Sequence, residues 1–181
     1  MNKEELISII LDCGATKAAA IKQENIVLSA HFREICASNQ CGGYGRCWMC
    51  PPDIGDIEEL MDQVRKYPSA ILYQTISEIE DSFDIEGMFE AGAGHAKISQ
   101  RIQHALKPVI DSEFLHLTCG GCHLCPTCAK VEGKPCRQPQ EALSSLEGYG
   151  VDVYKTTKGT GLKYINGENT VTYFGMILLS E

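Results

Sequence analysis

The distribution of cysteines is the feature that most constrains what this chain can fold into. Ten cysteines occur in 181 residues, and nine of them fall into two short segments. A disulfide framework usually spreads its bridges through a chain, whereas tight groups of cysteines are typical of metal-binding loops. We therefore expect two such loops, the first cysteine loop (residues 36–52) and the second cysteine loop (residues 119–136). Cys13 stands alone and is expected to be a small apolar core residue.

The second cysteine loop repeats a cysteine every third residue and adds one more eight positions later. A cubane iron–sulfur cluster needs one thiolate per iron with the irons close together, and a compact loop followed by a more distant cysteine can supply them. The preferred ligand set is Cys122, Cys125, Cys128 and Cys136. A second possible set is Cys119, Cys122 and Cys125 with a remote cysteine. Zinc is the alternative to a cluster, although structural zinc more commonly uses two separated Cys-x2-Cys pairs.

The first cysteine loop has wider spacings and leaves three interpretations open. Its cysteines are Cys36, Cys41, Cys47 and Cys50. Cys36, Cys41 and Cys50, with Cys47 as a possible fourth, can hold a second cluster. The loop can instead lend a ligand to a cluster shared with the second loop. A Cys47–Cys50 dithiol redox pair is the weakest interpretation, because two prolines directly after Cys50 fit poorly with the helix N-terminus that activates such a pair.

Outside the two loops, segments whose apolar residues recur with the period of a helix alternate with segments that are typical of strands. Helices are expected over residues 3–12, from Asp56 to just before Pro68, over 87–106 and over 139–147. Strands are expected over 18–22, 26–29, 69–76, 114–118 and 151–155, with a hairpin formed by 162–165 and 170–179. This order predicts an α/β or α+β fold, with helices packed on a single sheet, a C-terminal hairpin and two metal loops. No linker-like stretch interrupts it, so residues 1–181 are expected to form one domain.

Composition and charge narrow the classes of function. The formal net charge is −8, which argues against nucleic-acid binding because that needs a basic face. No run of 18 apolar residues occurs, so no membrane span is expected. Glu4 and Glu5 precede a short apolar run without a small-residue cleavage site, which is unlike a secretory signal. We therefore expect a cytoplasmic protein.

Several of these segments together resemble a family. They read Cys36-x4-Cys41-x2-Tyr-Gly leading to Cys50-Pro-Pro, then Gly-Cys122-x2-Cys125-x2-Cys128, then Pro-Cys136-Arg-x-Pro, and finally residues 146–153. In these motifs the chain is similar to an uncharacterised prokaryotic family described as predicted metal-binding proteins, a domain of unknown function. The resemblance covers most of the chain and implies metal binding without assigning a reaction. Cys47 and Cys119 depart from the family pattern, so they are possible additional ligands peculiar to this chain.

The leading functional hypothesis is a protein that binds one or two [4Fe–4S] clusters and acts in electron transfer or as a redox accessory. Its acidic surface would suit a basic redox partner protein. A zinc-stabilised binding module without redox activity is one alternative. A cluster enzyme is the other, with an open iron site at the first loop where the family pattern has three cysteines; its substrate is not specified by the sequence.

Overall fold

The computed structural model describes residues 2–181 and contains one five-stranded sheet. The strands are β1 (Lys17–Lys22), β2 (Ser69–Glu78), β3 (Phe114–Thr118), β4 (Ser144–Ser145) and β5 (Thr170–Leu179). Their order across the sheet is β1-β2-β5-β3-β4, and every neighbouring pair is antiparallel except β3 and β4. The long central strands β2 and β5 pair over their whole length, from Ser69 opposite Leu179 to Glu78 opposite Thr170.

Five α-helices accompany the sheet. They are α1 (Lys3–Asp12), α2 (His31–Ala37), α3 (Ile57–Arg65), α4 (Ile85–Leu106) and α5 (Val153–Thr157). Short 3-10 turns occupy η1 (Gln23–Asn25), η2 (Ala129–Glu132) and η3 (Glu147–Tyr149). Asn2 forms a capping box with Glu5 at the start of α1, and the Asp56 side chain accepts from the Glu58 backbone N–H at the start of α3. These polar caps satisfy backbone donors that a helix start would otherwise leave unpaired.

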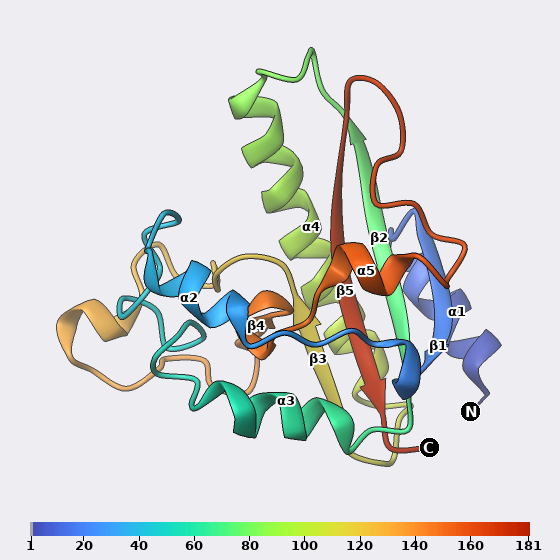
Figure 1. The fold of residues 1–181 in the computed structure, drawn as a ribbon, viewed down its shortest axis with the longest axis horizontal. Helices are drawn as coiled ribbons and strands as arrows, with labels where there is room; N and C mark the ends of the chain where they lie inside the picture. Colours follow the sequence, from blue (N-terminus) through green and yellow to red (C-terminus); the bar gives the residue numbers. More distant parts are fainter. Residues whose placement is uncertain (1) are drawn as a thin grey trace.

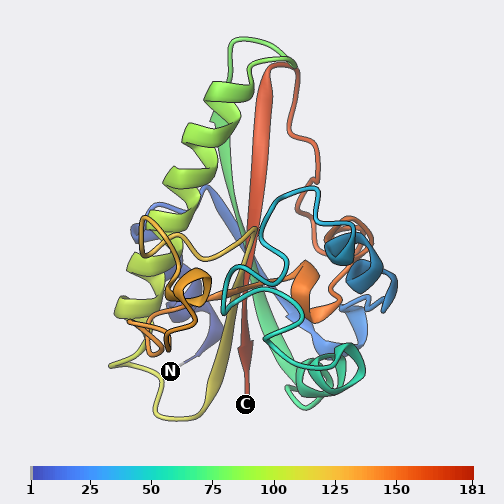
Figure 2. The same ribbon diagram turned by 90° about the vertical axis from the view of Figure 1, so that its left-hand side faces the viewer.

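Helices cover both faces of the sheet, which makes three layers (Figures 1 and 2). On one face, Leu6 and Ile10 of α1 and Ile102 and Leu106 of α4 pack on the strands. On the other face, Val64 of α3 and the segment 146–162 pack on the opposite side chains of the same strands. The two clusters follow the alternation of β2, in which successive side chains enter opposite layers. Buried apolar surface on both faces therefore fixes the sheet that carries the site.

The expected fold class is confirmed, with helices packed on one mixed sheet. The expected elements at 3–12, 18–22, 56–67, 69–76, 87–106, 114–118 and 170–179 are present with shifts of a few residues at their ends. Helix α2, the 3-10 turn η2 and the short strand β4 were not expected.

The segment 139–165 differs from expectation. Residues 139–147 form turns, the short β4 and the start of η3 rather than a helix. The expected strand at 151–155 is instead the helix α5, because the Asp152 side chain accepts from the Lys155 backbone N–H and caps a helical turn. The expected strand at 26–29 contributes only a single bridge, between Leu28 and Val151.

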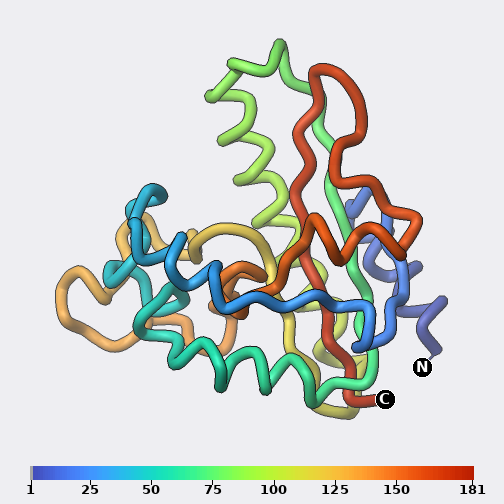
Figure 3. Tube along the Cα trace, in the orientation of Figure 1, coloured from blue at the N-terminus to red at the C-terminus, as the bar shows by residue number. Residues whose placement is uncertain are grey.

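The expected C-terminal hairpin is wrong. Residues 162–165 form no strand, and β5 pairs instead with β2 and β3. The Cα trace in Figure 3 shows the chain turning back into β5 beside β2. Among residues 2–181, no helix is both long and apolar enough to cross a membrane.

Candidate metal centres

The two cysteine loops lie together at the β3–β4 edge of the sheet (Figures 1 and 2). Strand β3 ends at Thr118 and delivers the chain directly into Cys119, so the sheet fixes where the second loop starts. The first loop begins at Cys36 near the end of α2 and continues as turns to the start of α3. The fold thus brings together two segments that are about 70 residues apart in sequence.

A small cavity of about 20 Å³ lies where the loops meet. Five cysteines line it: Cys47, Cys122, Cys125, Cys128 and Cys136. Four of these are the preferred ligand set of the second loop, and the fifth is contributed by the first loop. We call this arrangement the five-thiol cavity. It brings the four second-loop ligand candidates into one place and adds Cys47 to them.

The other first-loop cysteines face a second, much larger cavity. Cys36, Cys41 and Cys50 line it together with Cys119 and Cys122, and its volume is about 1000 Å³. We call it the large cavity. Cys122 lines both cavities, so the two candidate centres are adjacent.

Two glycines leave room around the sulfur of Cys50. A Cβ on Gly43 would lie 3.3 Å from the Cys50 sulfur and 3.7 Å from the Cys41 sulfur, and a Cβ on Gly121 would lie 3.5 Å from the Cys50 sulfur. Neither glycine has a positive φ, so the backbone conformation does not require glycine at either position. A side chain at either position would instead occupy the space beside the sulfurs. Both loops therefore approach the Cys50 sulfur with bare backbone, as a thiolate-ligated group requires.

The thiols influence one another's ionisation where the loops meet. Contact with the Cys50 thiol lowers the pKa of Cys47, and backbone N–H groups of Met49 and Cys122 act in the same direction. The same contact raises the pKa of Cys50, and burial raises it further. Cys128 also reaches the Cys47 thiol. The Gln138 side chain donates to the Cys125 sulfur at 3.7 Å, and N–H donors of this kind stabilise a thiolate ligand.

A clasp of three side chains ties the first loop to the second, formed by Trp48, Asp53 and Lys130. The Lys130 ammonium lies 4.2 Å from the centroid of the Trp48 ring and forms an ion pair with Asp53. The Trp48 indole N–H donates to the Lys134 carbonyl at 2.9 Å. The charged ends of Lys130 and Asp53 are mostly buried, with side-chain exposures of 24% and 14%. The clasp therefore holds the five-thiol cavity together from the side.

A buried hydrogen-bonded network supports the end of β3. The Tyr73 hydroxyl lies 2.8 Å from Ser99 Oγ and 2.7 Å from His116 Nε2, and Ser99 Oγ lies 2.9 Å from Thr118 Oγ1. Burial lowers the pKa of His116 to about 3, so this imidazole is neutral in the folded protein. The network satisfies polar groups that would otherwise be costly to bury, and it fixes Thr118 one residue before Cys119.

The sequence-predicted ligands separate into two sets in space. Cys122, Cys125, Cys128 and Cys136 share the five-thiol cavity, whereas Cys36, Cys41 and Cys50 share the large cavity. Within residues 2–181, no group of three or more histidine, cysteine, aspartate or glutamate side chains is arranged to hold a metal ion as they now point. The donor chemistry, the shared cavities and the bare backbone at Gly43 and Gly121 nevertheless fit a thiolate-bound metal. Binding must then reorient the thiols, as coupled metal binding and ordering does.

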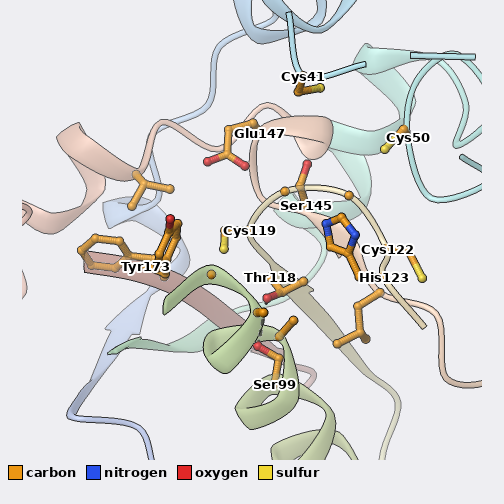
Figure 4. Close-up of a pocket in the computed structure, with 18 of the residues that line it drawn as sticks. Cys41, Cys50, Ser99, Thr118, Cys119, Cys122, His123, Ser145, Glu147 and Tyr173 are labelled. Carbon is orange, nitrogen blue, oxygen red and sulfur yellow. Dashed lines mark hydrogen bonds between the residues drawn. The ribbon is translucent and has the colours of Figure 1, made fainter. Parts of the chain in front are cut away.

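One functional candidate was missed from the sequence. The carboxyl of Glu147 faces the large cavity beside Cys119 (Figure 4). Burial raises the pKa of this carboxyl. Glu147 lies in residues 146–153, a segment that resembles the family pattern although it contains no cysteine. That resemblance was the sequence feature that could have identified Glu147 as a candidate.

Comparison with known proteins gives one match. A family model described as "Predicted metal-binding protein (DUF2284)" matches residues 19–179, which includes both cysteine loops. No curated protein and no solved structure matches the chain.

Proposed function

We propose that this chain, which belongs to the DUF2284 family of predicted metal-binding proteins, binds [4Fe–4S] clusters and uses them in electron transfer or as a redox accessory. The observation that carries the proposal is the five-thiol cavity, which is lined by three evenly spaced second-loop cysteines and Cys136. Cys122, Cys125, Cys128 and Cys136 would hold the first cluster. When bound, such a cluster supplies a one-electron carrier whose potential depends on burial and on hydrogen bonds to its sulfurs.

The protein's own groups would tune that centre. The Gln138 amide already donates to the Cys125 sulfur, and the Lys130 ammonium stands beside the loop as part of the clasp. Donors and cations close to a thiolate-ligated cluster favour its more negative, reduced state. Trp48 lines the same cavity and covers one side of it, which limits access of water. In the redox role proposed here, these contacts would help to set the potential of the cluster.

Cys36, Cys41 and Cys50 would form a second centre. Three thiols leave one iron of a cubane without a protein thiolate, and this set faces a cavity of about 1000 Å³. That observation favours a second candidate function, an enzyme in which the open iron acts as a Lewis acid. Cys119 lines the same cavity and is the candidate fourth ligand if the site is closed.

Zinc is the competing occupant, and one observation favours it. The five-thiol cavity holds about 20 Å³, room for about one water molecule or a single ion. Admitting a cubane requires the side chains around it to move outward, whereas a tetrahedral zinc site would need less movement. In the zinc case the metal would support folding and no electrons would move.

Anaerobic purification with matched variants tests the cluster proposal. We expect a brown protein with about four iron atoms and four sulfides per cluster, so about eight of each if both centres fill. Cys125→Ser should remove one cluster, whereas Cys13→Ser should change nothing, because Cys13 lines neither cavity. A colourless protein that holds only zinc after anaerobic reconstitution with iron and sulfide would contradict the proposal.

The proposed redox partner is a basic protein. The chain carries a formal net charge of −8, and complementary charge accelerates encounter between redox proteins. The rate of electron transfer to a basic acceptor such as a cationic cytochrome should therefore fall as salt is added. A rate to this acceptor that stays constant or rises with salt would contradict a basic partner.

A further inference from the structure

The large cavity has the size of a small-molecule site. Its volume is about 1000 Å³, at the upper end of the range that organic ligands and cofactors occupy. Its walls come from the first half of α4, the end of β3, strand β5, both cysteine loops and η3. Figure 4 shows Glu147, Cys119 and Tyr173 around the same space, with Cys41 and Cys50 on its far side.

Small residues on α4 keep this space open. Gly92, Ala93 and Ala96 line it at helical spacing. A Cβ on Gly92 would lie 3.4 Å from the Tyr173 ring, which is ordinary contact distance, so the glycine is not forced by packing. Larger residues at these positions would fill the cavity. At these three positions α4 adds little side-chain bulk to the wall of the cavity.

The remaining wall is aromatic and apolar. Tyr164 and Phe174 stack with their ring centroids 5.7 Å apart and their planes 11° apart, and both line the cavity. Tyr173, the preceding residue on β5, points to the opposite face of the sheet, where its hydroxyl donates to the Met88 carbonyl of α4 at 2.7 Å. Leu143 and Val153 complete this wall. Such a surface suits the flat or aliphatic body of an organic molecule, and aromatic faces also attract cations.

Glu147 is the inward-facing charged group of this cavity. Its carboxyl is held by its own backbone N–H and lies near Cys36 and Cys119. No other side chain within the described range 2–181 hydrogen-bonds or ion-pairs with it. Lys97 and His123 are the lining residues that can carry a positive charge, and both are exposed. Glu147 is half-buried, and a carboxylate held partly away from water without a cation is costly, so this carboxylate selects for a positively charged ligand.

We propose that the large cavity binds a small organic amine, with the protonated amine paired to Glu147 and the apolar body in the space that Tyr164 and Phe174 border on one side and the small residues of α4 on the other. An organic anion is disfavoured, because it would meet the Glu147 carboxylate. The bound molecule would lie beside Cys36, Cys41 and Cys50. The inference rests on the cavity and its carboxylate, and it holds whichever metal occupies the loops.

Isothermal titration calorimetry with three ligands of one shape tests the proposal. Tryptamine, tryptophol and indole-3-propionate carry an amine, a hydroxyl and a carboxylate on the same indole body. With the anaerobically purified full chain, tryptamine should bind at least about tenfold more tightly than tryptophol, because a charge-assisted pair is stronger than a neutral one. Indole-3-propionate should not bind. Equal affinity for the amine and the alcohol, or tighter binding of the acid, would overturn the proposal.

Three variants assign the effect to the cavity. Glu147→Gln should reduce the affinity for tryptamine to that for tryptophol. Glu90→Gln removes the same charge from an exposed position on α4 outside the cavity and should bind as the wild type does. Ala96→Phe should abolish binding of both ligands by filling the space. Circular dichroism confirms that each variant is folded.

Iron, sulfide and zinc are measured in the same samples, so loss of metal and loss of amine binding are separate results. Tryptamine binding that Glu147→Gln leaves unchanged refutes the assignment. The same holds if no saturation is reached at millimolar ligand.

Discussion

Replacing Lys130 tests whether the clasp between the loops stabilises the folded protein. Lys130→Met keeps most of the apolar stem against Trp48 and removes the ammonium. Two contacts are then lost, the one with the Trp48 ring at 4.2 Å and the ion pair with Asp53. The Asp53 carboxylate, with a side chain only 14% exposed, is left without its cation. One of its oxygens, Oδ2, is buried with no hydrogen-bond partner even in the intact protein.

The expected loss in the free energy of unfolding is about 3 kcal/mol. A cation over an indole ring contributes roughly 1 kcal/mol. Removing one partner of a fully buried ion pair costs about 3–5 kcal/mol, and the partial exposure of Lys130 and Asp53 reduces this to about 2 kcal/mol. Urea unfolding, followed by circular dichroism under anaerobic conditions, measures the difference. Metal content in the same samples shows whether the loosened loops also lose their metal.

Two further variants make the result specific. Lys134→Met removes a lysine from an exposed pair with Glu132, whose side chains are 68% and 42% exposed, and should cost less than about 0.5 kcal/mol. Adding Asp53→Asn to Lys130→Met removes the unpaired charge and should restore about 1 kcal/mol or more. If Lys130→Met is no more destabilising than Lys134→Met, the clasp does not stabilise the protein and the reasoning fails.

Three other predictions concern the core and the ligands. Gly175→Ala should destabilise the protein by about 3 kcal/mol, since its Cβ would lie 2.2 Å from the Tyr73 ring. Gly94→Ala is the control, because nothing lies within 4 Å of its Cβ. It should be neutral or slightly stabilising in the same urea assay. The pKa of His116 is about 3 when folded against 6.5 ordinarily, so the unfolded chain takes up a proton that the folded protein does not. Between pH 7 and pH 5 this proton uptake lowers the free energy of unfolding of the wild type by about 2 kcal/mol. His116→Gln should not show this loss. If the free energy of unfolding of the variant falls with pH as steeply as that of the wild type, the prediction is refuted. Cys47→Ser should leave iron and sulfide content unchanged because four second-loop thiols remain; loss of a cluster would make Cys47 a ligand.

Regular elements with long periodic patterns could be predicted from the sequence. Helices α1, α3 and α4 carry stripes of apolar residues, and α4 keeps its helix through Gly92 and Gly94 because Ile102 and Leu106 anchor its second half in the core. Strand β2 is a continuous buried run. In these segments the local preference and the tertiary burial point to the same structure.

The segment 139–165 could not be predicted because local signals there are weak or misleading. The β-branched residues around Val151 favour a strand, yet a single cap at Asp152 starts α5. Strand β5 takes its partners from β2 and β3, which are distant in sequence, so the nearby Leu162–Ile165 was a false partner. Strand pairing of this kind depends on the whole fold rather than on neighbouring residues.

Only some of the residues that line each candidate site could be predicted from the sequence. The even spacing of Cys122, Cys125 and Cys128 predicts that these thiols act together, and they share one cavity. Spacing carries no information on how the two loops dock, so the joining of Cys47 to the second loop came only from the structure. The cavity beside Cys50 and the inward turn of Glu147 also depend on tertiary packing. Spacing thus groups the second-loop cysteines, whereas the places of Cys47 and Glu147 depend on how the two loops dock.

Mössbauer spectroscopy tests the central claim most directly, applied to the full chain reconstituted anaerobically with isotopically enriched iron. The account predicts the signal of valence-delocalised iron pairs in a cubane cluster, lost in part when Cys125 is replaced by serine and retained when Cys13 is replaced. A spectrum of isolated tetrahedral iron, or protein that takes up zinc and no cluster iron, would contradict it.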